Sequence, residues 1–97
     1  MMNRLQYLTE KATALVQTAD LETKMRGRDL VTARGAFRLI AEAATALEEA
    51  AGLAPEPYRA EFRKRFIGLV QILGELNDAI RDLEGEEMAA AREATKH

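Results

Sequence analysis

Residues 62–83 read FRKRFIGLVQILGELNDAIRDL, and this stretch decides the fold class of the chain. Large apolar residues recur in it at alternating steps of four and three. Such an unbroken stripe is typical of a long helix whose apolar face packs against other helices. The stripe consists of Phe62, Phe66, Leu69, Leu73, Leu76, Ile80 and Leu83. We therefore predict an all-α fold in which this stripe, Leu73 included, lies in the core of a single chain.

Two groups of helix-breaking residues divide the chain. Gly52, Pro55 and Pro57 lie together, where glycine suits the end of one helix and proline the first turn of the next. Gly27 and Asp29 form a second break, with Asp29 as a helix N-cap. The apolar phase also shifts by four residues between the first two segments, which fits a turn or a stutter in one continuous helix. Because Gly27 lies in the shifted stretch, a turn is favoured.

We predict a single helical domain, residues 1–97, folded as an antiparallel three-helix bundle with heptad-like packing. Ala, Leu, Glu and Arg are frequent and all favour helix. The helices are expected at about 3–25, 30–51 and 57–84, and Gly85 is expected to end the third. The tail, residues 86–97, is then either frayed or a short fourth helix.

The order of charges supports the antiparallel arrangement. The second and third helices both begin basic and end acidic, which opposes the preference of the helix macrodipole. Two such helices relieve each other when the basic start of one meets the acidic end of the other. The acidic ends contain Glu42, Glu48 and Glu49 in the second helix and Glu75, Asp78, Asp82 and Glu84 in the third.

The composition excludes several kinds of chemistry. The chain has 97 residues, a net charge of −2 and no cysteine, and its one histidine is the last residue, His97. It also lacks serine. Hydrolysis by a Ser–His or Cys–His pair and a Cys/His zinc site are therefore excluded. We predict no catalytic residue, no metal and no cofactor. The N-terminal residues lack the apolar run of a signal peptide, so a cytoplasmic protein without membrane contact is expected.

The middle of the third helix is more apolar than a small bundle requires. Ile67, Val70 and Ile72 flank the main stripe there. Two neighbouring helices cover only about half of a helix, so we expect these residues to bind a partner. The predicted function is that of a non-enzymatic interaction protein, such as an adaptor, small subunit or regulatory partner. A homodimer is the simplest form of it. Gly68 and Gly74 are expected to permit close helix approach.

Two alternatives remain open. Arg26, Arg28, Arg34 and Arg38 concentrate positive charge around the first turn, where they could hold the phosphates of a nucleic acid. The third hypothesis is a carboxylate-metal enzyme. In this hypothesis Glu75, Asp78 and Asp82, on one face of the third helix, would provide oxygen ligands for Mg²⁺.

Overall fold

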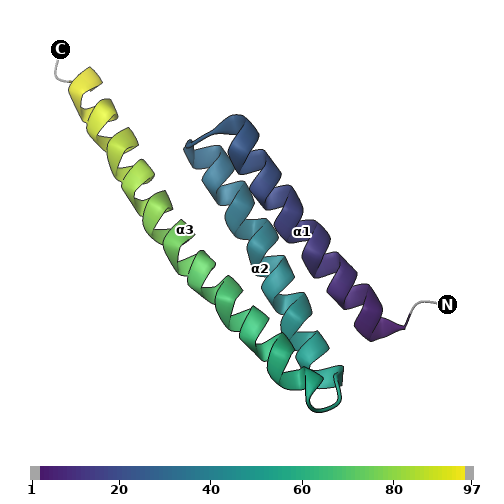
Figure 1. Cartoon of the computed structure of the whole chain (residues 1–97). Helices are drawn as coiled ribbons and strands as arrows, with labels where there is room; N and C mark the ends of the chain where they lie inside the picture. The colour runs from purple at the N-terminus through teal and green to yellow at the C-terminus, as the bar shows by residue number, and fades with distance from the viewer. Residues whose placement is uncertain (1–2, 96–97) are drawn as a thin grey trace.

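The computed structural model describes residues 3–95 and consists of three α-helices in that range. These are α1 (Arg4–Arg26), α2 (Leu30–Leu53) and α3 (Tyr58–Thr95). Consecutive helices run antiparallel, so that α1 and α3 point in the same direction (Figure 1). The predicted all-α, three-helix architecture is confirmed. Residues 96 and 97, the end of the predicted tail, lie outside the described range.

Both predicted breaks are turns. The Gly27 backbone has φ = 78°, a conformation that favours glycine, and its N–H donates to the Thr23 carbonyl at 3.0 Å. Asp29 is the N-cap of α2, because its Oδ1 accepts a hydrogen bond from the Thr32 backbone N–H at 2.7 Å. A stutter within one continuous helix is thereby excluded. The second break, between Leu53 and Tyr58, holds both prolines.

The end of the third helix was predicted wrongly. α3 passes through Gly85 without interruption and reaches Thr95, so the described residues contain no separate fourth helix. A glycine inside a helix costs only about 1 kcal/mol relative to alanine. The residues after Gly85 are mostly Glu, Ala, Met and Arg, which propagate a helix well. Every described residue from Glu84 to Thr95 is exposed, and this segment extends beyond the other two helices (Figure 1).

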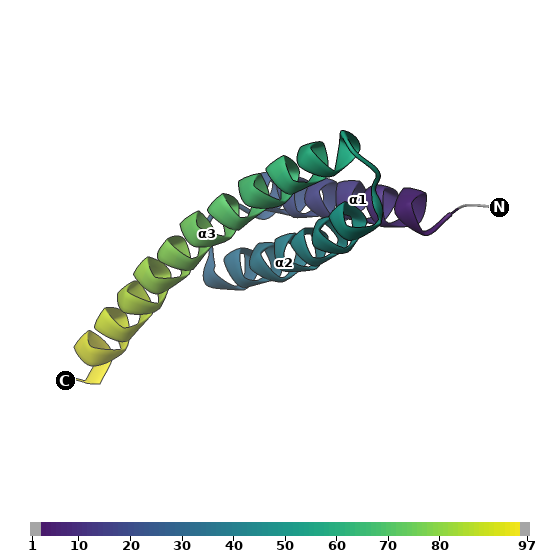
Figure 2. The ribbon, with the colours of Figure 1, turned by 90° about the horizontal axis from the view of Figure 1, so that it is seen from below.

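The three helices form an open arrangement with α2 in the middle. α2 packs against both neighbours, but no Cα of α1 lies within 8 Å of a Cα of α3. Helices in direct contact have axes about 8–10 Å apart. Seen from below, α1 and the first half of α3 lie on the same side of α2 (Figure 2).

The core consists mainly of small side chains from α2. Ala43, Ala50 and Ala54 are fully buried, and no large side chain among the described residues is as deeply buried. Of the predicted stripe on α3, only Leu69 and Leu83 are buried, and the other five residues, Leu73 included, are half-buried. The stripe does face the core as predicted, because Phe62, Phe66, Leu73 and Leu76 pack against the buried cluster that contains Leu69. Its burial is only partial, because α3 has one neighbour rather than two.

Ion pairs join the ends of neighbouring helices, and the one between α2 and α3 is of the kind that the charge order predicted. Arg34, near the start of α2, lies 3.6 Å from the carboxylate of Glu84 on α3. Arg4, at the start of α1, binds Glu49 near the end of α2 at 2.8 Å. All four side chains are largely exposed, so each pair contributes at most about 1 kcal/mol. The two ion pairs favour the antiparallel order of the helices.

Candidate partner-binding groove

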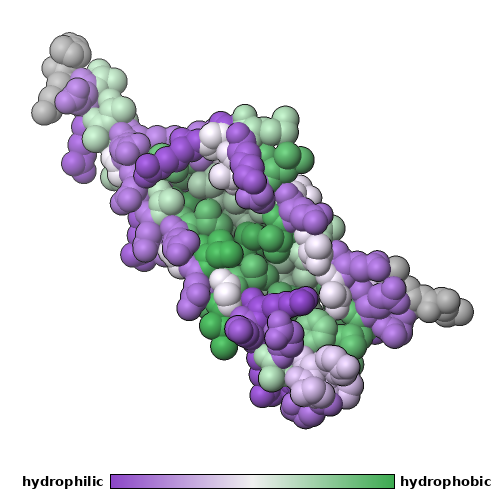
Figure 3. Space-filling model, in the orientation of Figure 1, coloured by the Kyte–Doolittle hydropathy of each residue, from purple (hydrophilic) through white to green (hydrophobic). Residues whose placement is uncertain are grey.

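An apolar groove runs between α1 and α3 with α2 as its floor. In the orientation of Figure 1, apolar side chains gather along the middle of the molecule and polar ones border them on both sides (Figure 3). The central part has a volume of about 380 Å³. Protein interiors tolerate few voids larger than a water molecule, so this space is an open site rather than a packing defect. Its lining consists of Ala12, Thr13, Val16 and Gln17 of α1, Leu47 of α2, and Arg65, Gly68, Leu69 and Ile72 of α3.

The groove continues toward the α2–α3 turn. A second hollow there lies between Leu5 and Thr9 of α1 and Tyr58 and Phe62 of α3, with Pro55 at its end. Leu5 and Phe62 are half-buried and Tyr58 is exposed. We call the two hollows together the α1–α3 groove. Each of the two hollows has one wall from α1 and one from α3.

The two threonine hydroxyls in the α1 wall already have hydrogen-bond partners within their own helix. The Thr9 hydroxyl donates to the Leu5 carbonyl at 2.9 Å, and the Thr13 hydroxyl donates to the Thr9 carbonyl at 3.0 Å. A hydroxyl bonded within its own helix loses little when water is removed from it. Covering this wall with another apolar surface therefore carries a small desolvation cost.

Gly68 is unexplained by the packing of this chain. It lines the groove, and a Cβ placed there would meet no atom within 4 Å. A Cβ placed at Gly74 would also meet no atom within 4 Å. The expected close approach of helices at these two glycines does not occur among residues 3–95. At Gly68 the space that the glycine leaves opens into the groove.

The three predicted partner-binding residues are all exposed, but they do not form one surface. Their exposed fractions are 56% for Ile67, 45% for Val70 and 39% for Ile72. Ile72 lines the groove, whereas Ile67 lines a different hollow with Glu48, Arg59 and Arg63. Val70 is about 200° from Ile72 around the helix. The exposure agrees with the expectation that this bundle cannot cover them, and their role in binding stays a prediction.

Residues of α1 in the groove were not predicted. Val16 is not among the partner-binding residues that the sequence predicted, and Thr9 and Thr13 are polar residue types. The available signal was the i, i+4 spacing of Ala12 and Val16, together with the threonine methyl groups on the same side of the helix. Without the position of α3, nothing distinguished that side from the outer surface.

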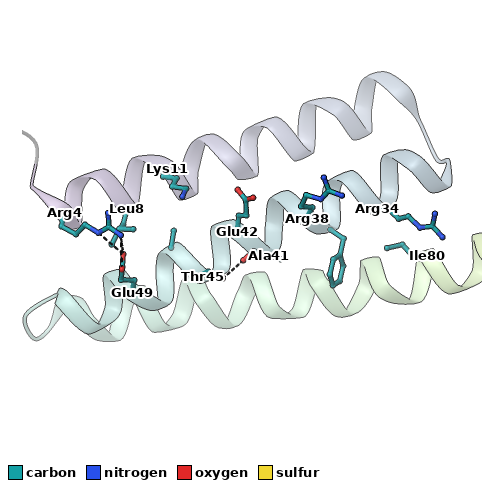
Figure 4. A pocket seen from close by; sticks show the side chains of 12 residues that line it. Arg4, Leu8, Lys11, Arg34, Arg38, Ala41, Glu42, Thr45, Glu49 and Ile80 are labelled. Atoms are coloured by element: carbon teal, nitrogen blue, oxygen red, sulfur yellow. Dashed lines mark hydrogen bonds and ion pairs between the residues drawn. The ribbon is translucent and has the colours of Figure 1, made fainter.

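The predicted arginine cluster is divided. Arg34 and Arg38 line a hollow on the other side of α2, where Arg4 and Lys11 of α1 join them (Figure 4). Arg26 and Arg28 flank the turn between α1 and α2 and do not line this hollow. Acidic residues share the hollow, since Glu42 and Glu49 lie along it and Arg4 pairs with Glu49. Lys11 and Arg38 form no ion pair with any residue in the range 3–95.

The acidic residues of α3 are not joined by further potential metal ligands in the described part of the chain. Within residues 3–95, no three His, Cys, Asp or Glu side chains lie close enough to hold a metal ion, so Glu75, Asp78 and Asp82 lack further ligands there. No described helix combines the length and hydropathy that a membrane-spanning segment requires. Comparison with protein-family models, curated proteins and solved structures finds no match.

Proposed function

We propose that this protein is a non-enzymatic helical interaction protein that binds its partner in the α1–α3 groove. The middle of α3, from Arg65 to Ile72, forms one wall of the binding surface. In this role the three helices are an incomplete bundle, and the partner contributes the missing helical layer.

One observation carries this proposal. Most of the buried side chains are alanines, and several of the large apolar side chains that line the open groove are only half-buried. Leu5 and Val16 of α1 and Phe62 of α3 line the groove and are half-buried. Ile72 of α3 also lines it and is 39% exposed. Removing such apolar surface from water contributes about 25 cal/mol per Å², which is the main driving force of association between helical proteins. In a monomer these side chains stay in contact with water, so this free energy is not gained.

A photo-reactive residue placed in the groove tests the proposal. We would replace Ile72 with p-benzoylphenylalanine, irradiate cells that express the protein and look for a discrete product of higher mass. Val31 is the matched control, because it is 73% exposed and lies outside the groove. We expect a product from position 72 and none from position 31. Absence of a product at position 72, or equal products at both, would contradict the proposal.

A second candidate function follows from the hollow on the other side of α2. Lys11 and Arg38 line it and are without acidic partners in residues 3–95, so they could bind the phosphates of a nucleic acid. Glu42 and Glu49 reduce the local positive potential. Electrophoretic mobility shifts with random-sequence RNA and DNA at two salt concentrations test this. Salt-sensitive binding that Arg38→Gln weakens would favour it, and no shift at micromolar protein would reject it.

A further inference from the structure

The proposed function leaves the identity of the partner open. We propose that the partner in the groove is a second copy of this chain, and that the two α3 helices cross antiparallel at the level of Val70. This inference rests on the proposed function and names the partner for the same groove. Its basis is a set of α3 residues whose sizes and charges match those of the same set in a second, antiparallel copy.

The pattern lies along the groove-facing side of α3. Arg65, Gly68, Ile72 and Glu75 follow one another at steps of three, four and three, which places them on one side of the helix. The first three line the groove, and Glu75 lies one turn beyond Ile72. The spacing is symmetric about Val70. A two-fold axis at that level therefore brings each member of the set opposite a different member in the second copy.

Size is complementary in this pairing. Ile72 of one copy lies opposite Gly68 of the other, and the same contact occurs twice. Ile72 is 39% exposed, and nothing in its own chain occupies the space beside Gly68. A large side chain opposite a glycine lets two helices approach closely. This contact supplies the close approach at Gly68 that the single chain lacks.

Charge is complementary as well. Arg65 of each copy lies opposite Glu75 of the other, so two ion pairs border the apolar contact. Glu75 forms no ion pair in residues 3–95. The guanidinium of Arg65 has a long ion pair of 3.8 Å with Glu61 and lies 6.0 Å from the centre of the Phe62 ring, both in its own helix. A parallel crossing would instead place Arg65 beside Arg65 and Glu75 beside Glu75. Repulsion between like charges would reject that orientation, which makes the antiparallel one specific.

A charge exchange tests the pairing. Sedimentation equilibrium of the wild type at tens of micromolar should show a dimer. Arg65→Glu and Glu75→Arg should each weaken dimerisation by about tenfold or more, because each change turns two attractive contacts into repulsive ones. The double variant R65E/E75R should recover most of the wild-type affinity, since the exchanged charges again face each other. Only a second copy that carries both changes can give that recovery.

A pair of glycine variants tests the size contact separately. Gly68→Gln should weaken dimerisation, whereas Gly74→Gln should not, although both glycines lie inside α3 with free space around them. Circular dichroism checks that both variants fold. Equal effects of the two variants would overturn the proposed contact.

The outcomes separate this inference from the proposed function. A monomeric wild type, or a double charge variant that fails to recover, would overturn the second copy as partner. If position 72 then gave a photo-product with a different protein, the groove would keep its proposed function and lose only this partner. If position 72 gave no product, both proposals would fail.

Discussion

α2 and α3 differ in how they use their apolar residues. α2 buries ten of its 24 residues, six of them alanines, whereas α3 buries two of 38 although it carries the longest apolar stripe. The reason is position, because α2 has a neighbour on each side and α3 has only one. Burial in this molecule therefore follows from the number of neighbouring helices. Among the apolar residues of α3 that no neighbour covers, Ile72 lines the groove, whereas Ile67 lines a different hollow.

Truncating matched leucines should show this difference most strongly. Leu47 of α2 is 5% exposed, whereas Leu73 of α3 is half-buried. We expect Leu47→Ala to lower the free energy of unfolding by about 2–5 kcal/mol. Leu73→Ala should cost about half as much in the monomer, because less surface is removed from the core. Urea denaturation at low micromolar protein measures both. Equal losses would mean that α3 is covered as fully as α2.

Enlarging an alanine should also affect the two helices differently. Ala50 of α2 is fully buried between neighbours, and Ala60 of α3 is exposed. Ala50→Leu should destabilise the fold by about 1–3 kcal/mol, because the helices must move apart. Ala60→Leu should change stability by less than about 0.5 kcal/mol. A tolerated Ala50→Leu would show that the packing around α2 is looser than its burial indicates.

Two glycines should respond with opposite signs. Gly27 has φ = 78° before α2, and Gly85 has helical geometry in the exposed part of α3. Gly27→Ala should destabilise by about 1 kcal/mol, because a Cβ strains that conformation. Gly85→Ala should raise the helix content and stabilise α3 locally by about 0.5–1 kcal/mol. Circular dichroism at 222 nm with thermal melting measures both. A loss of helix in Gly85→Ala would contradict the continuous α3.

Removing the N-cap of α2 should have the smallest effect on stability, and this effect should depend on pH. The Thr32 backbone N–H donates to Asp29 and holds the pKa of that carboxyl below its ordinary value of 3.8. Folding therefore favours the ionised form, and the stabilisation present above the ordinary pKa is lost as pH falls through the lowered pKa. Asp29→Ala should lower the melting temperature at pH 7, and the difference from wild type should narrow in acid. Asp29→Asn keeps an acceptor, so a loss as large as that of Asp29→Ala would argue against the cap.

Local chemistry made much of the fold predictable. Gly27, Asp29 and the Gly52–Pro57 segment determine where helices end, and the opposed charges of α2 and α3 favour the antiparallel order. The apolar period identified a face on α3, but a period does not say how many helices cover that face. The separation of α1 and α3 could therefore not be predicted from the sequence. The same is true of the difference between Ile72, which lines the groove, and Ile67, which does not.

The extension of α3 beyond α2 separates helix content from the folded state of the bundle. Residues Gly85–Thr95 are held only by hydrogen bonds within their own helix, and an isolated helix of this length is marginal in water. Its amides should exchange with deuterium by local fraying, without any opening of the core around α2. On heating, the ellipticity should decline steadily before the cooperative transition begins. The ellipticity lost in that slope belongs to the last turns of α3, whereas the steep transition that follows reports the bundle.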